Sequence, residues 1–298
     1  MGSALLWAPF LFFSGNLTAS DHREQIEIAA VVDWSRYKIF LKATQQIPGE
    51  MNDEMRPQLR ESLRQALLTK SSQLVESLVF NAPAEDEEKN ENILARLNHF
   101  FRLQKLASFQ VAENRALGTL EIALRGKDSV LFFMPNSANL ESYNLIERGS
   151  VSDVQYETAN QTGEYQTTHH ESIPYTSLVV DARHLNFKPG LNPAIFSQNG
   201  RLIYSADFLT AETLKKRGAA GFSENLNERD IQLRTGSRPL RISALELFSQ
   251  QTSSVVISEE DAEKILRHEK SISNLKKARV AFLVAKGLLV QKVFLPRK

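Results

Sequence analysis

The chain has 298 residues, and 36 lysine and arginine residues against 35 aspartate and glutamate residues leave a net charge of +1. Hydrophobic residues make up 42% of the chain and charged residues 24%, a composition typical of a soluble globular protein with one large or two modest domains. The balanced charge argues against a nucleic-acid-binding protein, and the absence of cysteine excludes disulfides, thiol catalysis, cysteine-ligated metals and a lipidated cysteine.

The N-terminus carries an apolar run over residues 4–13. This run is too short to span a bilayer but suits the hydrophobic region of an export signal, and small residues follow at 18–20. No positive residue precedes Arg23, which departs from the usual pattern. We expect residues 1–20 to be a signal peptide, with a packed or unstructured apolar N-terminus as the alternative. No other run suggests a transmembrane segment.

Residues 26–136 are predicted to form an N-terminal α+β lobe. The stretch 26–41 is rich in β-branched and aromatic residues, which predicts one long strand or a hairpin around 33–35. Leucines then recur at helical spacing over 55–80, and Asn52 is placed to cap this amphipathic helix.

A second helix follows, to which we assign Phe100, Phe101 and Phe109 as core residues. Two strands are then expected at 118–124 and 129–134. The order of strands and helices predicts a sheet with helices packed on one face.

Residues 137–173 are poor in apolar side chains and form a polar insertion or linker between two lobes. His169 and His170 stand beside Glu171 in this stretch. Adjacent side chains of an extended segment point to opposite sides, and no His-Glu-x-x-His spacing is present. A polar surface loop is therefore favoured over a metal site.

Residues 174–286 are predicted to form a C-terminal α+β lobe. A β-rich run over 176–185 ends at a Pro-Gly break, and a hairpin follows with Asn199 and Gly200 at its turn. Asn-Gly favours a two-residue turn in which both residues have positive φ.

The rest of this lobe has further predicted elements. The strand 253–257 leads into a helix that is capped by Ser258 and runs to about residue 270. Residues 278–285 (ARVAFLVA) are apolar apart from Arg279, which predicts a central strand. The tail 287–298 is expected to be either an added edge strand or a docking peptide for a partner.

Candidate binding residues in this lobe are three arginines. Arg183 and Asp181 are expected to form a buried or half-buried ion pair, with each other or with neighbouring strands, or else Arg183 is expected to clamp a carboxylate or phosphate. Arg234 and Arg238 flank a short polar segment that forms an ordinary turn or an anion-binding nest. No phosphate-binding glycine loop, dinucleotide fingerprint or nucleophile elbow is present.

The second lobe resembles a family of exported bacterial proteins that includes the twenty-kilodalton outer-membrane lipoprotein type and a region of flagellar ring protein T. The residues that carry the likeness are 175–183 (YTSLVVDAR), Pro189, Leu191, 193–195 (PAI), 199–201 (NGR), Tyr204, 218–222 (GAAGF), 255–258 (VVIS), 261–262 (DA) and 279–280 (RV). The helix at 55–80 and residues 118–122 fit the same pattern, so the likeness covers roughly 28–285. The chain departs from the family at Ser177 and His184, where glycine is usual, and it lacks the lipidated cysteine.

The resemblance implies a periplasmic or envelope location, partners among envelope or flagellar proteins, and neither catalytic residues nor a cofactor. We therefore expect a non-enzymatic structural or assembly protein of the bacterial envelope associated with the flagellum, not lipidated, without nucleic acid, and open to peripheral membrane association. The alternative is a periplasmic module that binds an anion or small molecule through Arg183, Arg234 and Arg238. A hydrolase remains a third hypothesis, supported only by the presence of serine, histidine and aspartate, because a triad is recognised by geometry. The expected fold is α+β, with two lobes of mixed sheets, helices packed on one face, and a long polar insertion between them.

Overall fold

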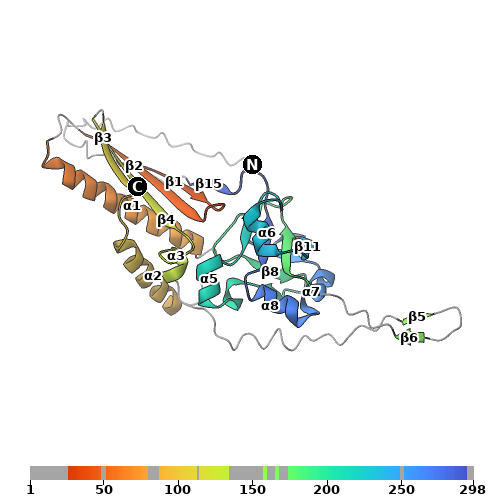
Figure 1. Ribbon diagram of the computed structural model, residues 1–298. Helices are drawn as coiled ribbons and strands as arrows, with labels where there is room; N and C mark the ends of the chain where they lie inside the picture. Colours follow the sequence, from red (N-terminus) through yellow and green to blue (C-terminus); the bar gives the residue numbers. More distant parts are fainter. Residues whose placement is uncertain are drawn as a thin grey trace, which may run out of the picture.

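The computed structural model describes residues 26–47, 52–79, 87–112, 114–133, 157–159, 165–167, 174–248 and 252–293. These residues form an α+β structure in two lobes that lie side by side (Figure 1), which confirms the predicted fold class. The first lobe comprises 26–133 together with 290–293, and the second comprises 174–289. The predictions for residues 1–20, for His169 and His170, and for most of 137–173 lie outside the described residues.

The first lobe is built on an antiparallel sheet of five strands in the order β15-β1-β2-β4-β3. The strands are β1 (Ile26–Asp33), β2 (Lys38–Gln46), β3 (Ser108–Ala112), β4 (Arg115–Ala123) and β15 (Val290–Val293). In β2 and β4, buried residues alternate with more exposed ones, as in a sheet with one face turned to a core. The region 26–41 is therefore a hairpin, one of the two predicted alternatives. The tail supplies an edge strand at 290–293, as one of its two predictions proposed.

Two helices lie on the same side of this sheet (Figure 1), namely α1 (Met55–Val79) and α2 (Glu87–Arg102). The Asn52 side chain accepts a hydrogen bond of 2.9 Å from the Met55 backbone N–H, so the predicted cap is confirmed. Leu63 is fully buried and lies against Gly118, where a Cβ atom would stand only 3.3 Å from the Leu63 Cβ. The glycine thus lets helix and sheet approach closely.

Two predictions in this lobe are wrong. Residues 129–134 contain the short helix α3 (Val130–Phe133) instead of a strand, because a brief apolar run has no period that separates the two. Phe109 belongs to β3 and not to the second helix, which ends at Arg102. Asn114, with a φ of 58°, lies in the turn that joins β3 to β4.

The second lobe contains a parallel sheet in the order β10-β14-β7-β11 and a mixed sheet in the order β12-β13-β8-β9. Its strands are β7 (Ser177–Asp181), β8 (Ala194–Ser197), β9 (Leu202–Tyr204), β10 (Gly221–Ser223), β11 (Pro239–Ser243), β12 (Glu246–Leu247), β13 (Ser254–Ile257) and β14 (Val280–Leu283). Its helices are η2 (Ala206–Phe208), α5 (Ala211–Arg217), α6 (Arg229–Thr235), α7 (Glu259–Leu266) and α8 (Glu269–Leu275). Between the lobes in sequence, β5 (Glu157–Ala159) and β6 (Tyr165–Thr167) form a separate antiparallel pair.

The centre of the parallel sheet is buried on both faces. All four residues of β14 are buried, which confirms the predicted central strand at 278–285. On one face, Ile231 of α6 packs with Val179 and Ala281. On the other face, the Phe282 ring stacks on Phe187 with centroids 4.9 Å apart, within the core shared with the mixed sheet. Such double burial explains why apolar residues are contiguous at 178–180 in β7 and throughout β14.

The predicted hairpin around Asn199 and Gly200 is present, but its turn is of another type. Gly200 has a φ of 77°, and Asn199 is not among the residues with positive φ. The Ser197 N–H donates to the Arg201 carbonyl at 2.9 Å, which encloses a three-residue loop with its left-handed residue last.

The helix capped by Ser258 is confirmed at its start and wrong at its end. The Ser258 hydroxyl accepts from the Asp261 N–H at 3.1 Å. The helix ends at Leu266, and α8 begins as a separate helix at Glu269. None of the helices in the described part of the chain has both the length and the apolar character that a membrane span requires.

Candidate functional site

The tip of the β1–β2 hairpin is inserted against the second lobe. The Trp34 backbone N–H donates to the Leu289 carbonyl at 2.8 Å, and the buried Trp34 ring meets Phe222 edge-on with centroids 5.6 Å apart. The buried Tyr37 hydroxyl donates to the Ala220 carbonyl. Two aromatic side chains from the first lobe therefore complete the core of the second.

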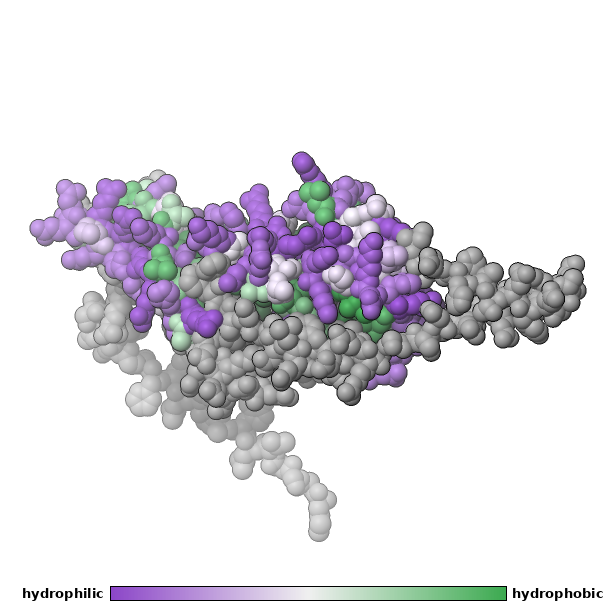
Figure 2. All heavy atoms as spheres, turned by 60° about the horizontal axis from the view of Figure 1, so that its bottom comes forward, coloured by the Kyte–Doolittle hydropathy of each residue, from purple (hydrophilic) through white to green (hydrophobic). Residues whose placement is uncertain are grey.

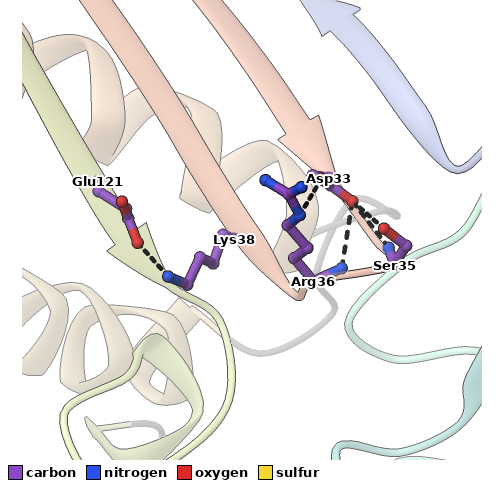
Figure 3. A network of polar contacts seen from close by, with 5 residues as sticks. All are labelled: Asp33, Ser35, Arg36, Lys38 and Glu121. Carbon is purple, nitrogen blue, oxygen red and sulfur yellow. Dashed lines mark hydrogen bonds and ion pairs between the residues drawn. The ribbon is translucent and has the colours of Figure 1, made fainter. Parts of the chain in front are cut away.

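A polar network gives the hairpin tip its shape (Figure 3). Asp33 Oδ1 accepts from the Ser35 N–H at 3.0 Å, from the Ser35 hydroxyl at 2.6 Å and from the Arg36 N–H at 3.1 Å. Beside it, Lys38 on β2 forms an ion pair with Glu121 on β4. The carboxylate of Asp33 satisfies the turn backbone locally, as aspartate commonly does at turns.

A second contact joins the lobes next to the hairpin. The Gly126 N–H donates to the Lys215 carbonyl at 2.8 Å. The guanidinium of Arg125 lies over the Tyr37 ring at 4.1 Å, and its Nη2 is 3.9 Å from Asp230 Oδ2 on α6. Arg125 thus bridges a first-lobe loop, the hairpin tip and a second-lobe helix through a cation–π contact and an ion pair.

These groups surround a pocket of about 260 Å³ between the lobes. The residues that define its chemistry are Ser35, Tyr37, Arg125, Phe222, Asp230 and Arg234. It contains cationic and anionic groups together: Arg125 contacts an aromatic ring and a carboxylate, and Arg234 donates to backbone carbonyls. Within the described part of the chain, no group of histidine, aspartate and glutamate residues could hold a metal ion.

Arg234 has a structural role, because its side chain links α6 to two other segments of the second lobe. Its side chain is buried, Nη1 donates to the Ala278 carbonyl at 2.7 Å, and Nη2 donates to the Arg217 carbonyl at the end of α5. Burial lowers the pKa of this guanidinium, while the nearby Tyr37 and Tyr204 hydroxyls oppose the shift. A Cβ atom on Gly221 would lie 2.9 Å from Arg234 Cδ, so the glycine makes room for the arginine stem. Sequence reasoning placed Arg234 in a turn, whereas it lies in the last turn of α6.

The other two candidate arginines have different partners from Arg234. Arg183 Nε donates to Asp181 Oδ1 at 2.9 Å, which confirms the predicted ion pair, and this hydrogen bond lowers the pKa of the Asp181 carboxyl. Arg238 lies 5.7 Å from the centroid of the Tyr175 ring. Because β7 and β11 are parallel, Arg183 follows the carboxyl end of one strand and Arg238 precedes the amino end of the other. The structure does not bring the three arginines together.

Sequence reasoning missed the part that Trp34, Tyr37 and Arg125 play between the lobes. Two large aromatic residues in a hairpin turn, where polar residues usually stand, are the signal that could have revealed it. Their partners Phe222 and Ala220 are distant in sequence, so only the tertiary structure identifies them.

The buried tyrosines predict an alkaline loss of stability. Burial raises the pKa of Tyr37 and of Tyr204, whose hydroxyl donates to the Ala219 carbonyl. In the unfolded chain a tyrosine ionises near pH ~10. The stabilisation is therefore complete below about pH 10 and is lost as pH rises toward the higher folded-state pKa values.

We expect Tyr204→Phe to cost about 1 kcal/mol at neutral pH through its lost hydrogen bond. Above about pH 10 this difference should shrink, because the variant no longer has to keep one phenol protonated. Urea unfolding of both proteins at about pH 8 and about pH 10.5 measures the change. If the stability difference between wild type and Tyr204→Phe stays constant or grows with pH, the raised pKa of the buried Tyr204 hydroxyl is contradicted.

The chain is thus a two-lobed α+β protein whose second lobe is a parallel sheet packed on a mixed sheet. Residues 177–286, from the first residue of β7 to beyond β14, match the family model described as Treponema pallidum Tp0624, second domain. The match covers less than half of the chain, so it relates the second lobe, and not the whole protein, to that bacterial family. No curated protein matches the chain.

Proposed function

We propose that this protein is a non-enzymatic component of the bacterial cell envelope, exported to the periplasm, with a structural or assembly role associated with the flagellum. The resemblance of residues 175–280 to exported bacterial proteins and to a region of flagellar ring protein T supports this role. The match of residues 177–286 to a bacterial domain is consistent with it.

The observation that carries the proposal is a sheet that is joined to the second lobe and has one face with half-buried apolar residues. Among the described elements, the helix with the most extensive contacts to the first-lobe sheet is α1, which lies on the other face. The opposite face carries Val31, Phe40 and Leu117, all half-buried, among charged side chains. The hairpin tip and β15 hold this sheet firmly to the second lobe. A rigid surface of this kind suits binding of another protein.

The charged groups of the second lobe support a contact role better than the alternative of an anion-binding module. The Arg234 guanidinium donates hydrogen bonds to two backbone carbonyls, and the Arg183 guanidinium donates to the Asp181 carboxylate. Arg238 lies at the opposite end of the parallel sheet from Arg183. No observation favours a ligand held jointly by these three residues.

The proposal is tested by fractionation and cross-linking in a bacterium that carries the native gene. A tagged chain is expected in the periplasmic fraction, and cross-linked partners identified by mass spectrometry should be envelope or flagellar proteins. Recovery of the chain from the cytoplasm would contradict the location. A hydrolase or transferase activity that Arg183→Ala, His169→Ala or His170→Ala abolishes would contradict the non-enzymatic role.

A further inference from the structure

The strand at the edge of the first-lobe sheet opposite β15 is β3. β3 pairs with β4 on one side, and no strand in the described part of the chain pairs with its other side. An edge strand presents unpaired N–H and C=O groups that can accept an added strand from another chain. Phe109 of β3 is paired with Gly118, which lies against Leu63 of α1, so the Phe109 side chain faces the helix layer.

A hollow of about 450 Å³ adjoins this edge on the helix side. The residues that line it are Arg56, Pro57, Arg60, Leu106, Ala107, Ser108 and Phe109. Leu106 and Phe109 are half-buried and give the hollow an apolar part. Arg56 and Arg60, one helical turn apart on α1, give it two exposed guanidinium groups.

The next arginine along α1, Arg64, differs from Arg56 and Arg60 because it has close polar partners. Arg64 forms an ion pair with Glu61 at 3.0 Å and donates to the Gln104 and Arg102 carbonyls at 3.1 and 3.0 Å. Arg56 and Arg60 form no ion pair or hydrogen bond with any described residue. Arg60 interacts with Glu61 only through longer-range electrostatic attraction, so both guanidinium groups beside the strand edge have no close acidic partner among the described residues.

We propose that the β3 edge and the Arg56–Arg60 pair bind an extended acidic segment of a partner protein, which adds to the sheet as a further strand. This inference rests on the proposed contact function and names the chemistry of its partner. Along an extended strand, residues i and i+2 face the same side about 7 Å apart. Arg56 and Arg60 are separated by about 6 Å of rise along α1, which runs beside the strands in Figure 1. Acidic side chains at i and i+2 therefore match the two guanidinium groups.

The outer surface agrees with recognition through a strand edge and charge. In Figure 2, which turns the bottom of Figure 1 toward the viewer, hydrophilic side chains cover most of the coloured surface, and hydrophobic ones occur in small separate groups. A broad apolar patch of the kind that drives helix or membrane docking is not seen on that coloured part. Backbone pairing provides affinity in strand addition, and the two arginines provide selectivity for acidic residues.

The test uses the full chain and a fluorescein-labelled synthetic peptide of alternating valine and glutamate, with binding followed by fluorescence anisotropy. We expect binding to this peptide and not to a peptide of alternating valine and lysine. The double variant Arg56→Gln with Arg60→Gln is expected to weaken binding by about tenfold or more. The matched control, Arg201→Gln with Arg241→Gln, makes the same charge change at exposed positions of the second lobe and should leave affinity unchanged.

Two further peptides separate strand addition from simple charge attraction. One carries N-methyl groups on its odd-numbered amides and the other on its even-numbered amides, so each removes donors from one edge of the peptide strand. Strand addition predicts that only one of the two loses affinity, because one edge pairs with β3. Equal affinities for both N-methylated peptides, or equal losses in the two double variants, would overturn the proposal.

Self-association is checked by sedimentation velocity on the same proteins. A dimer that Arg56→Gln with Arg60→Gln dissolves would show that a second copy occupies this edge, which also overturns the proposal. Failure of the wild-type chain to bind the acidic peptide overturns the inference alone, since cross-linking in the envelope decides the contact function independently.

Discussion

Replacing Trp34 with alanine is expected to destabilise the protein by about 3–5 kcal/mol, the cost typical of removing a large buried aromatic side chain. The ring is fully buried at the hairpin tip and contacts both Tyr37 and Phe222 edge-on. Its removal leaves a cavity between the lobes, where the surrounding strands are held by backbone pairing and cannot collapse freely. Urea unfolding followed by far-ultraviolet circular dichroism measures the loss.

Two companion variants make the Trp34 result interpretable. Trp34→Phe should cost much less, because it keeps most of the ring, and the indole Nε1 has no hydrogen-bond partner to lose in the described structure. Phe40→Ala removes an aromatic ring from the half-buried open face and should also cost less than Trp34→Ala. A loss below about 1 kcal/mol for Trp34→Ala would show that the hairpin tip does not join the lobes.

Arg234→Ala is expected to have the second large effect, a loss of about 2–4 kcal/mol. The variant leaves the buried carbonyl of Ala278 and that of Arg217 without their donors and opens a cavity next to Gly221. In the opposite direction, the variant removes the free-energy cost of burying a guanidinium group that no described carboxylate neutralises. We expect the loss of the two hydrogen bonds to outweigh the removed desolvation cost, because the arginine donates to both carbonyls.

Arg234→Met separates the two contributions, because it keeps much of the side-chain volume and removes the donors. We expect it to recover part of the loss but to remain less stable than the wild type. Arg238→Ala is the matched control for an exposed arginine nearby and should change stability by no more than about 0.5 kcal/mol. Thermal or urea unfolding that shows Arg234→Met at or above wild-type stability would mean that desolvation outweighs the hydrogen bonds.

The elements that sequence predicted well are those whose pattern is long or chemically distinctive. Regular leucine spacing and the Asn52 cap indicated α1, and an unbroken apolar run indicated β14. Short elements escaped prediction, as with the helix at 130–133 and the three-residue strand β10, because a few residues cannot display a period. Their structure depends on the neighbours that they pack against.

The candidate site shows the same division between local and tertiary information. The Asp181–Arg183 ion pair is local and was predicted from its spacing. The burial of Arg234 was not, since its acceptors belong to Arg217 and Ala278 on other elements. The sequence of the tail was compatible with an edge strand, but its pairing with β1 depends on a register between the two ends of the chain.

The pairing of β15 with β1 also bears on the order in which the chain can fold during synthesis. β1 leaves the ribosome before the whole of the second lobe and β15 leaves after it, so β1 lacks its β15 neighbour until the second lobe has been synthesised. Contacts between such remote segments slow folding, because a large loop must close before they form. The sheet of the first lobe is therefore begun before the second lobe is made and completed only after it.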